Sequence, residues 1–240
     1  MNLNEIKQKL LNEYKYKIEL HAHTSPVSGC SQILPKDMAE TYKALGYDGV
    51  VITNHFNIRG DMTKEEYLDF YLKDYEETKV YGESLGLKVY LGTEIRFTEN
   101  NNDYLIFGVN REILSEIYDL LPYGVENFRK AYKMEEGIFI QAHPFRDGMV
   151  RVAPELLDGM EVYNLHPNHN SRVALASKYA KEKGIDIIIA GSDYHHPGLN
   201  HEGLSALRST YLPEDSFEIA KILKSKNYIL EAGVGNIILK

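Results

Sequence analysis

Histidine and acidic residues lie at or just after the ends of most apolar, strand-like segments of this chain. Imidazole and carboxylate groups are ligands for divalent ions such as Zn, Mn and Fe. A random distribution would put many of the nine histidines on helix surfaces instead. The clustering therefore predicts a metal centre, and its candidate residues are His21, His23, His55, Glu94, His143, Glu161, Asp193 and His195.

The segment "YKIELHAH" (16–23) contains two of these histidines in an H-x-H motif. Side chains alternate along a strand, so His21 and His23 are expected to point to the same place. Glu19 would share their face, and we expect it to orient one histidine as a hydrogen-bond acceptor. For an isolated motif, the alternative is a solvent-facing strand with alternating polar residues.

The segment "IIIAGSDYHHPG" (187–198) is an aliphatic run that ends in a small-residue turn. Such a run predicts a strand buried on both faces of a parallel sheet. Active-site residues of α/β barrels follow the carboxyl ends of strands. Alternation would direct Asp193 and His195 to one side and His196 into solvent. A histidine-rich surface loop is the alternative.

Two arginines are candidate substrate-binding groups because a guanidinium binds phosphate oxygens in a bidentate manner. Arg96 shares a predicted strand face with Glu94, so a salt bridge between the two is the alternative. Arg146 follows His143 on a loop and could instead be an ordinary surface charge. For His143, the alternative is a hydrogen-bonded histidine before the turn-forming Pro144.

The loop "NLHPNHNSR" (164–172) adds His166 and His169 before a predicted helix. Either residue could contact a substrate. For His166 we expect a surface position.

These residues require an alternation of strands and helices to bring them together. Strands are predicted at 16–23, 48–56, 88–97, 103–109, 137–145, 159–164 and 185–195, and helices at 34–46, 63–86, 111–135 and 171–184. Thr63 and Glu66 form a predicted capping box. The tail from residue 213 is expected to form a helix and a short strand. Alternating elements predict a mostly parallel sheet, and 240 residues suit one domain or one α/β barrel.

Composition narrows the class of protein. The formal net charge of -8 argues against binding of long nucleic acids through a basic face, but it permits a small anionic substrate. Cys30 is the single cysteine, so no internal disulfide can form. There is no apolar run long enough for a membrane span, and "MNLNEIKQKL" lacks signal-peptide features, so a cytoplasmic location is expected. Nothing indicates an oligomeric state.

Taken in order, the H-x-H motif, "ITNH" (52–55), Glu94, "AHPFR" (142–146) and "GSDYH" (191–195) resemble the PHP (polymerase and histidinol phosphatase) family. The resemblance extends from about Lys17 to His195. It implies an α/β fold, a distorted seven-stranded (β/α)7 TIM-like barrel, in a single PHP-type metallo-phosphoesterase domain over 1–240. It also implies hydrolysis of phosphoesters with one to three divalent ions, which would be Zn, Mn or Fe.

Carried over by position, the resemblance assigns ligands to each metal. The first ion would be held by His21, His23, Glu94 and Asp193. The second would be held in part by His55 with Glu94, and the third in part by His143 with His195. Family members often have a histidine on the fourth strand near Leu105, so Asp103, two residues away on the same face, is a further candidate ligand.

The chain departs from the family pattern at three places. Ser28 stands about where many members have an acidic or histidine ligand. Cys30 could substitute for it, although a lone cysteine is more often a small buried residue. Asn54 replaces a frequent aspartate, and Leu105 the fourth-strand histidine. These departures affect the second and third metal and leave the first intact.

The expected reaction is hydrolysis of a small phosphomonoester by metal-activated water, without a protein nucleophile. Histidinol phosphate and nucleotides are candidate substrates, and His169 is a candidate for protonating the leaving group. One alternative is a metal-dependent amidohydrolase, although that family usually has a bridging lysine, which these strand ends lack. The other is a degenerate metal-binding partner module, which Ser28 and Asn54 motivate.

Overall fold

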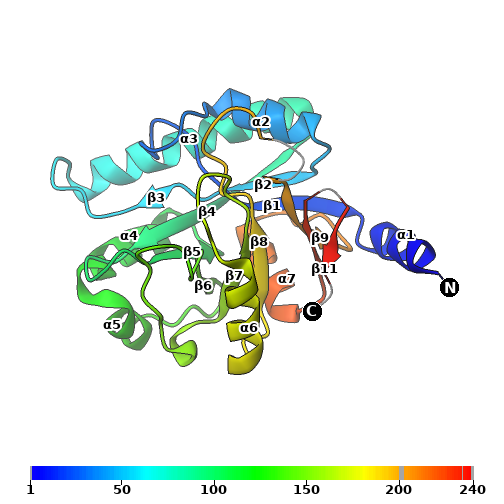
Figure 1. Cartoon of the computed structure of the whole chain (residues 1–240). Helices are drawn as coiled ribbons and strands as arrows, with labels where there is room; N and C mark the ends of the chain where they lie inside the picture. Colours follow the sequence, from blue (N-terminus) through cyan, green and yellow to red (C-terminus); the bar gives the residue numbers. More distant parts are fainter. Residues whose placement is uncertain (1, 200–202, 234, 239–240) are drawn as a thin grey trace.

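The computed structural model describes residues 2–199, 203–233 and 235–238, and an 11-stranded sheet forms its centre (Figure 1). The strands are β1 (Tyr16–Ala22), β2 (Gly49–Ile52), β3 (His55–Phe56), β4 (Lys88–Arg96), β5 (Asp103–Phe107), β6 (Ile138–Gln141), β7 (Gly159–Asn164), β8 (Ile188–Gly191), β9 (Ser205–Ser209), β10 (Ile229–Ala232) and β11 (Ile237–Ile238). Their order is β11-β10-β9-β1-β2-β4-β5-β6-β7-β8, with β3 paired to β4 off this path.

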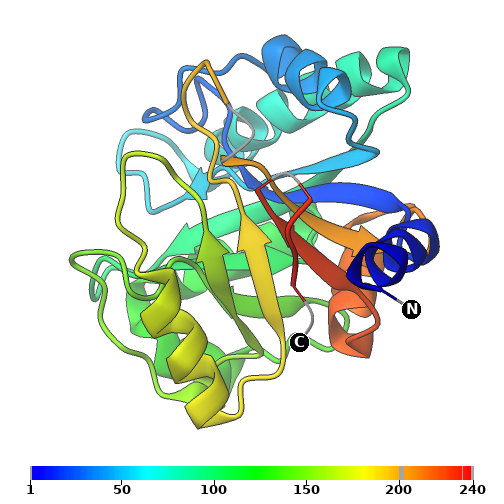
Figure 2. The same ribbon diagram turned by 45° about the vertical axis from the view of Figure 1, so that its right-hand side comes forward.

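Helices cover the curled sheet from outside. They are α1 (Leu3–Glu13), α2 (Pro35–Ala44), α3 (Lys64–Leu85), α4 (Arg111–Leu120), α5 (Gly124–Ala131), α6 (Val173–Lys183) and α7 (Ser216–Ser225), with short 3-10 turns at Leu121–Tyr123 and Pro154–Leu156. The predicted capping box of Thr63 and Glu66 is confirmed at the start of α3. Figure 2 shows α6 beside β7, and α1 at the edge of the molecule. Across the described residues, no helix combines the length and apolarity that crossing a membrane requires.

The sheet is mixed rather than mostly parallel, which corrects the expectation from the sequence. Strands β1, β2 and β4 pair in parallel, as do β6, β7 and β8. Strand β5 is antiparallel to both β4 and β6. The connection 97–102 between β4 and β5 is too short for a crossover helix, so the chain must return in the opposite direction.

The strands outnumber the seven of the predicted barrel and the one short strand expected in the tail. The segment 48–56 is divided into β2 and β3, and β9 and β10 extend the sheet beyond β1. Strand β9 and helix α1 were not predicted. The sequence of β9, "SALRS", has no β-branched or aromatic residue, and α1 buries no side chain, so neither has a strong pattern.

The first and last strands of the predicted barrel meet at their carboxyl ends, as the sequence predicted. Ala22 and Tyr194 form a parallel bridge. Backbone N–H groups of Asp193 and His23 donate to the carbonyls of His21 (2.9 Å) and Tyr194 (3.1 Å), respectively. At its other end β1 pairs with β9 instead. The sheet therefore curls into an incomplete barrel whose closure lies beside the metal-binding residue types.

Apolar side chains fill both sides of this sheet. One cluster contains Ile18, Leu105 and Ile140 from the strands together with Ile219 of α7. A second cluster packs α3, α4 and α5 against β3 to β6. Hydrophobic packing therefore fixes the strands whose ends hold the polar residues.

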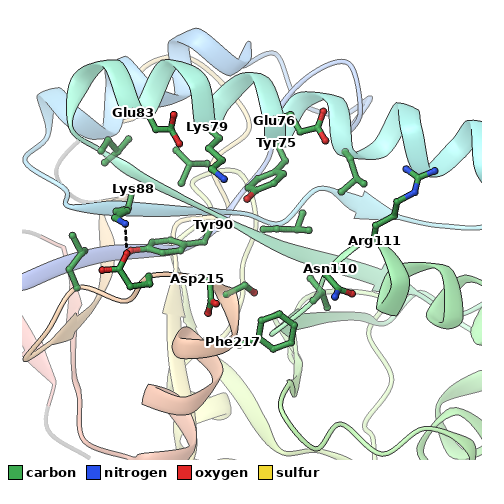
Figure 3. A pocket seen from close by; sticks show the side chains of 18 of the residues that line it. Tyr75, Glu76, Lys79, Glu83, Lys88, Tyr90, Asn110, Arg111, Asp215 and Phe217 are labelled. Atoms are coloured by element: carbon green, nitrogen blue, oxygen red, sulfur yellow. Dashed lines mark hydrogen bonds and ion pairs between the residues drawn. The ribbon is translucent and has the colours of Figure 1, made fainter.

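A cavity of about 750 Å³ lies between α3, β4 and the start of α7 (Figure 3). Lys88, Tyr90 and Phe217 are among its lining residues. It lies at the amino end of β4, whereas Glu94 lies toward the carboxyl end. The cavity is therefore separate from the cluster of predicted metal ligands.

The packing predicts that Phe139→Ala destabilises the protein by about 3–5 kcal/mol. The Phe139 ring is fully buried and stacks on Tyr104 with ring centroids 4.7 Å apart, so its removal leaves a cavity. Chemical denaturation measures the free energy of unfolding. Val80→Ala is the control, since Val80 is 66 % exposed, and it should leave stability nearly unchanged. Equal small effects of both substitutions would contradict this account of the core.

Candidate metal centre

Two histidines from β1 converge as the H-x-H spacing predicted. His21 and His23 are fully buried, and their ring centroids are 5.0 Å apart. Strand β1 contains a bulge, because Glu19 pairs with Val50 and Ala22 with Ile52. The extra residue turns His21 to the face opposite Glu19.

The bulge overturns the expectation that Glu19 orients a histidine ring. Glu19 Oε1 accepts hydrogen bonds from the backbone N–H of Leu20 (3.0 Å), His21 (2.9 Å) and Ser192 (3.0 Å). Its side chain also accepts from the Ser205 hydroxyl. Glu19 thus satisfies backbone donors at the bulge and fixes β1 against the segment after β8.

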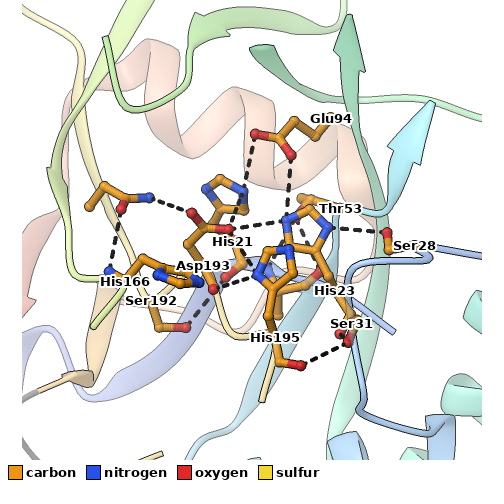
Figure 4. Close-up of polar contacts among 12 residues, drawn as sticks. His21, His23, Ser28, Ser31, Thr53, Glu94, His166, Ser192, Asp193 and His195 are labelled. Atoms are coloured by element: carbon orange, nitrogen blue, oxygen red, sulfur yellow. Dashed lines mark hydrogen bonds and ion pairs between the residues drawn. The ribbon is translucent and has the colours of Figure 1, made fainter. Parts of the chain in front are cut away.

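Glu94 and Asp193 complete a group of four with the two histidines (Figure 4). Glu94 Oε1 lies 3.4 Å from His21 Nε2, and Glu94 Oε2 lies 3.5 Å from His23 Nε2. Asp193 Oδ1 lies 3.4 Å and 3.3 Å from the same two nitrogens. Ligand atoms around a tetrahedral ion with bonds of about 2.1 Å are about 3.4 Å apart. The four side chains therefore have the spacing of a metal site.

Three buried atoms of this group lack hydrogen bonds. These atoms show whether a metal ion would fit between the four side chains. Among the described residues, His21 Nε2, His23 Nε2 and Glu94 Oε2 have no hydrogen bond of good geometry, although Glu94 Oε2 lies 2.8 Å from His55 Nδ1. Buried polar atoms are normally paired, because an unpaired one costs free energy. A divalent cation between them would complement all three, so the residues present fit a metal ion.

A second group contains His55, Glu94 and Asp103. His55 Nδ1 lies 2.8 Å from Glu94 Oε2. His143 Nε2 lies 3.0 Å from Glu94 Oε1 and 3.8 Å from Asp103 Oδ2. Arg96 forms a bidentate pair with Asp103, with both nitrogen–oxygen distances at 2.7 Å. The salt bridge considered for Arg96 is therefore made to Asp103 rather than to Glu94.

A third group contains His23, His55 and His195. The His23 ring centroid lies 4.6 Å from that of His55 and 4.2 Å from that of His195. His195 Nδ1 is 2.8 Å from the backbone oxygen of Asp193. His143 lies beside Glu94 and Asp103, and its expected pairing with His195 at a third metal stays a prediction.

Glu161 contacts the His21 ring, a role that the sequence did not assign. Its Oε1 lies 2.8 Å from His21 Nδ1, and its Oε2 accepts from the backbone N–H of His143 at 2.8 Å. A side chain at Gly191 would overlap this pair, since its Cβ would lie 2.1 Å from Glu161 Oε1. The sequence feature that could have indicated this role is the position of Glu161 within the predicted strand 159–164.

Asp193 reaches the site through a turn rather than through strand alternation. Strand β8 ends at Gly191, and Asp193 has φ 53°, in the left-handed region. The predicted convergence of Asp193 with His195 is correct, but the reason given for it was wrong. Asp193 Oδ2 also accepts a hydrogen bond from Arg146, whose Nη2 donates to Asn164 Oδ1 at 3.0 Å.

The remaining histidines of this region differ in burial. His166 was expected at the surface but is only 6 % exposed, because its ring packs 5.4 Å from that of His195. Burial lowers the pKa of His166 to about 4. His169 is exposed, with its ring 4.4 Å from that of His166. His196 is exposed, as predicted.

The electrostatics favour ionised carboxylates at Asp193 and Glu94 and a neutral imidazole at His23, whereas neighbouring carboxylates raise the pKa of His21 and of His55 against the effect of burial. Burial opposes ionisation of Asp193, but His21, His23 and Arg146 nonetheless hold its pKa well below the usual range. The pKa of Glu94 is likewise held low by His21 and His55, against the effect of burial. Burial and the neighbouring His195 and His55 lower the pKa of His23. Ionised carboxylates and neutral imidazole are the forms that bind metals.

The departures from the family pattern have structural roles here. The Ser28 hydroxyl donates to Asn54 Oδ1 at 2.9 Å and accepts from the His55 backbone N–H at 3.0 Å. Asn54 Nδ2 in turn donates to the Thr24 hydroxyl at 2.8 Å. Cys30 is exposed, not buried.

Comparisons with solved structures show where else this fold occurs. A two-domain protein from Bacteroides vulgatus, described as containing a predicted PHP-like metal-dependent phosphoesterase, matches with a TM-score of 0.65 and 16 % identity. The match covers 91 % of this chain but only 65 % of that protein, so this chain spans less than two thirds of its length. PsfC from Pseudomonas syringae matches with a TM-score of 0.63 and 12 % identity over 91 % of this chain and 92 % of its own.

At these identities the structural matches establish the fold alone. No curated protein sequence matches the chain. The model of the PHP domain family matches residues 19–232, which include every predicted metal ligand. The resemblance inferred from the order of the motifs is therefore confirmed, and the chain belongs to the PHP domain family.

Proposed function

We propose that this protein hydrolyses small phosphomonoesters with the help of divalent metal ions. The observation that carries the proposal is the convergence of His21, His23, Glu94 and Asp193 on one point, with Arg146 in contact with Asp193. The ligand set of imidazoles and carboxylates suits Zn, Mn or Fe.

Bound metal ions supply Lewis-acid chemistry, which activates water and neutralises charge on the phosphoryl oxygens. The protein residues hold and orient these ions. Glu161 orients the His21 ring, because Glu161 Oε1 is hydrogen-bonded to His21 Nδ1. The other ring nitrogen, Nε2, therefore faces the remaining ligands. Asp103 is held in turn by Arg96. A cluster of this kind requires no protein nucleophile.

Arg146 is the better supported of the two proposed substrate-binding cations. Its Nη2 is engaged by Asp193 and Asn164, so the planar group is held beside the metal ligands. Among the described residues its Nε has no partner, which leaves donor capacity for a phosphate oxygen. Arg96 uses Nε and Nη2 for Asp103, and its substrate role stays a prediction.

A cavity of about 480 Å³ beside His195 supports a small substrate. His166, His195 and His196 are among its lining residues, and its volume is within the range of sites for small molecules. His169 is exposed near this region, which is consistent with the proposed transfer of a proton to the leaving group. The acidic net charge of -8 disfavours long nucleic acids as substrates.

The two other functions are less well supported. A guanidinium beside carboxylate-held metals suits a dianionic phosphate better than a neutral amide, which disfavours an amidohydrolase. A degenerate partner module would not need several groups of unpaired buried ligand atoms. Keeping such atoms unpaired costs stability unless a metal binds them.

The first prediction concerns the reaction class. Metal-loaded protein should release phosphate from phosphomonoesters and should stop doing so when a chelator is added. A panel of phosphomonoesters, phosphodiesters and amides, each with Zn, Mn and Fe(II), measures this. Amide cleavage without phosphate release would reject the proposal. Inactivity of a fully metallated sample would instead favour the partner module.

The second prediction concerns Asp193→Asn. An amide is a much weaker ligand than a carboxylate, so activity should fall by about 100-fold or more. The fold should persist, because Asp193 lies after the strand and outside the hydrophobic clusters. Phosphate release and circular dichroism measure the two effects. Asp119→Asn is the matched control and should retain activity, because the Asp119 side chain is 63 % exposed on α4. A fully active Asp193→Asn protein would remove Asp193 from the site.

The third prediction concerns Glu161→Gln, which tests a positioning role. The amide weakens the hydrogen bond that orients His21, and metal affinity should fall by about 10–100-fold. Competition with a chromophoric chelator measures the affinity directly. Glu40→Gln is the control, because the Glu40 side chain is 54 % exposed on α2. Unchanged metal affinity in Glu161→Gln would contradict the positioning role.

A further inference from the structure

Asn164 is a buried residue at the end of β7, between the metal ligands and the loop that follows this strand. It is 3 % exposed, and both the nitrogen and the oxygen of its side-chain amide form hydrogen bonds. No function was predicted for it from the sequence. Its partners on the two sides of the amide differ in charge, and this difference indicates a function.

The amide nitrogen of Asn164 donates to two carboxylates. Nδ2 lies 3.0 Å from Glu161 Oε2 and 3.2 Å from Asp193 Oδ2. The second oxygen of each carboxylate faces the metal centre. Glu161 Oε1 lies 2.8 Å from His21 Nδ1. Asp193 Oδ1 lies 3.4 Å from His21 Nε2 and 3.3 Å from His23 Nε2. Asn164 thus holds the oxygens that point away from the centre and leaves the other two directed at it.

The amide oxygen of Asn164 accepts hydrogen bonds from groups on the other side. Oδ1 lies 3.0 Å from Arg146 Nη2, 2.9 Å from the Ser171 hydroxyl and 3.3 Å from the His166 backbone nitrogen. Arg146 Nη2 also donates to Asp193 Oδ2. One side chain therefore connects the proposed phosphate-binding arginine, a metal ligand and the loop after β7.

The partners of Asn164 require an amide at this position. Ionised carboxylates can only accept hydrogen bonds, whereas a guanidinium and a backbone N–H can only donate. A side chain between these groups must offer a donor on one side and an acceptor on the other. An aspartate would put an oxygen against Glu161 and Asp193, and a leucine of similar size would leave buried donors and acceptors unpaired.

We propose that Asn164 is a positioning residue that fixes the Arg146 guanidinium relative to Asp193, so that phosphate meets both the arginine and the metal. The inference rests on the proposed function, in which Arg146 binds phosphate. Arg146 Nη2 donates to Asp193 and to Asn164, and these two contacts set the plane of the guanidinium. Among the described residues Arg146 Nε is buried without a partner, so it is the donor available to phosphate. Without Asn164 one of the two contacts is lost, and the guanidinium can rotate.

Binding of inorganic phosphate to the zinc-loaded protein tests this inference. Calorimetry should show that Asn164→Leu raises the Kd for phosphate about 10-fold. The same substitution in an Arg146→Gln protein should raise the Kd further by less than about twofold, because Asn164 acts through the arginine. Asn12→Leu is the control and should bind phosphate as the wild type does, since Asn12 is exposed on α1.

A general structural role of Asn164 would give the same loss in both backgrounds, and that result would overturn the inference. So would wild-type protein that binds no phosphate. Circular dichroism and zinc content check each variant. If Asn164→Leu does not fold, Asn164→Ser gives the same comparison, because its short hydroxyl cannot bridge Arg146 and Asp193.

The outcome is separate from the proposed reaction. An Arg146-dependent loss of phosphate affinity in a protein that hydrolyses no phosphoester would support the positioning role and reject the reaction. Phosphoester hydrolysis together with a phosphate Kd that Asn164→Leu leaves unchanged would do the reverse.

Discussion

The fold depends on how it accommodates several ionisable groups buried around one point. His21, His23, Glu94 and Asp193 are almost completely removed from solvent, although burial of charged groups is unfavourable. Opposite charges offset part of this cost, as Arg146 does for Asp193 and Arg96 for Asp103. The unpaired nitrogens of both histidines are the part of the cost that a divalent cation would remove.

Irregularities in two strands make this arrangement possible. The bulge in β1 separates the face of Glu19 from that of His21. A second register shift, between Glu161 and Tyr163 of β7, puts Glu161 and Asn164 on the same side, where Asn164 Nδ2 donates to Glu161 Oε2 at 3.0 Å. Gly191 leaves space for the pair of Glu161 and His21. Bulges commonly redirect side chains next to active sites.

Two of the three residues that depart from the family pattern form one connected unit. Ser28 and Asn54 are hydrogen-bonded to each other and hold the turn that contains Cys30. The Cys30 side chain on this turn is exposed.

The family, the main strands and helices, and the metal-ligand residue types could be predicted from the sequence alone, because strand ends and the H-x-H spacing can be read from local patterns. The sequence also predicted the closure between β1 and the segment after β8. It could not determine the mixed sheet, the side chain that orients His21, or the burial of His166. Register shifts, the short return from β4 to β5 and contacts between distant segments decide these features. Such features depend on pairing partners far along the chain, so only the tertiary structure fixes them.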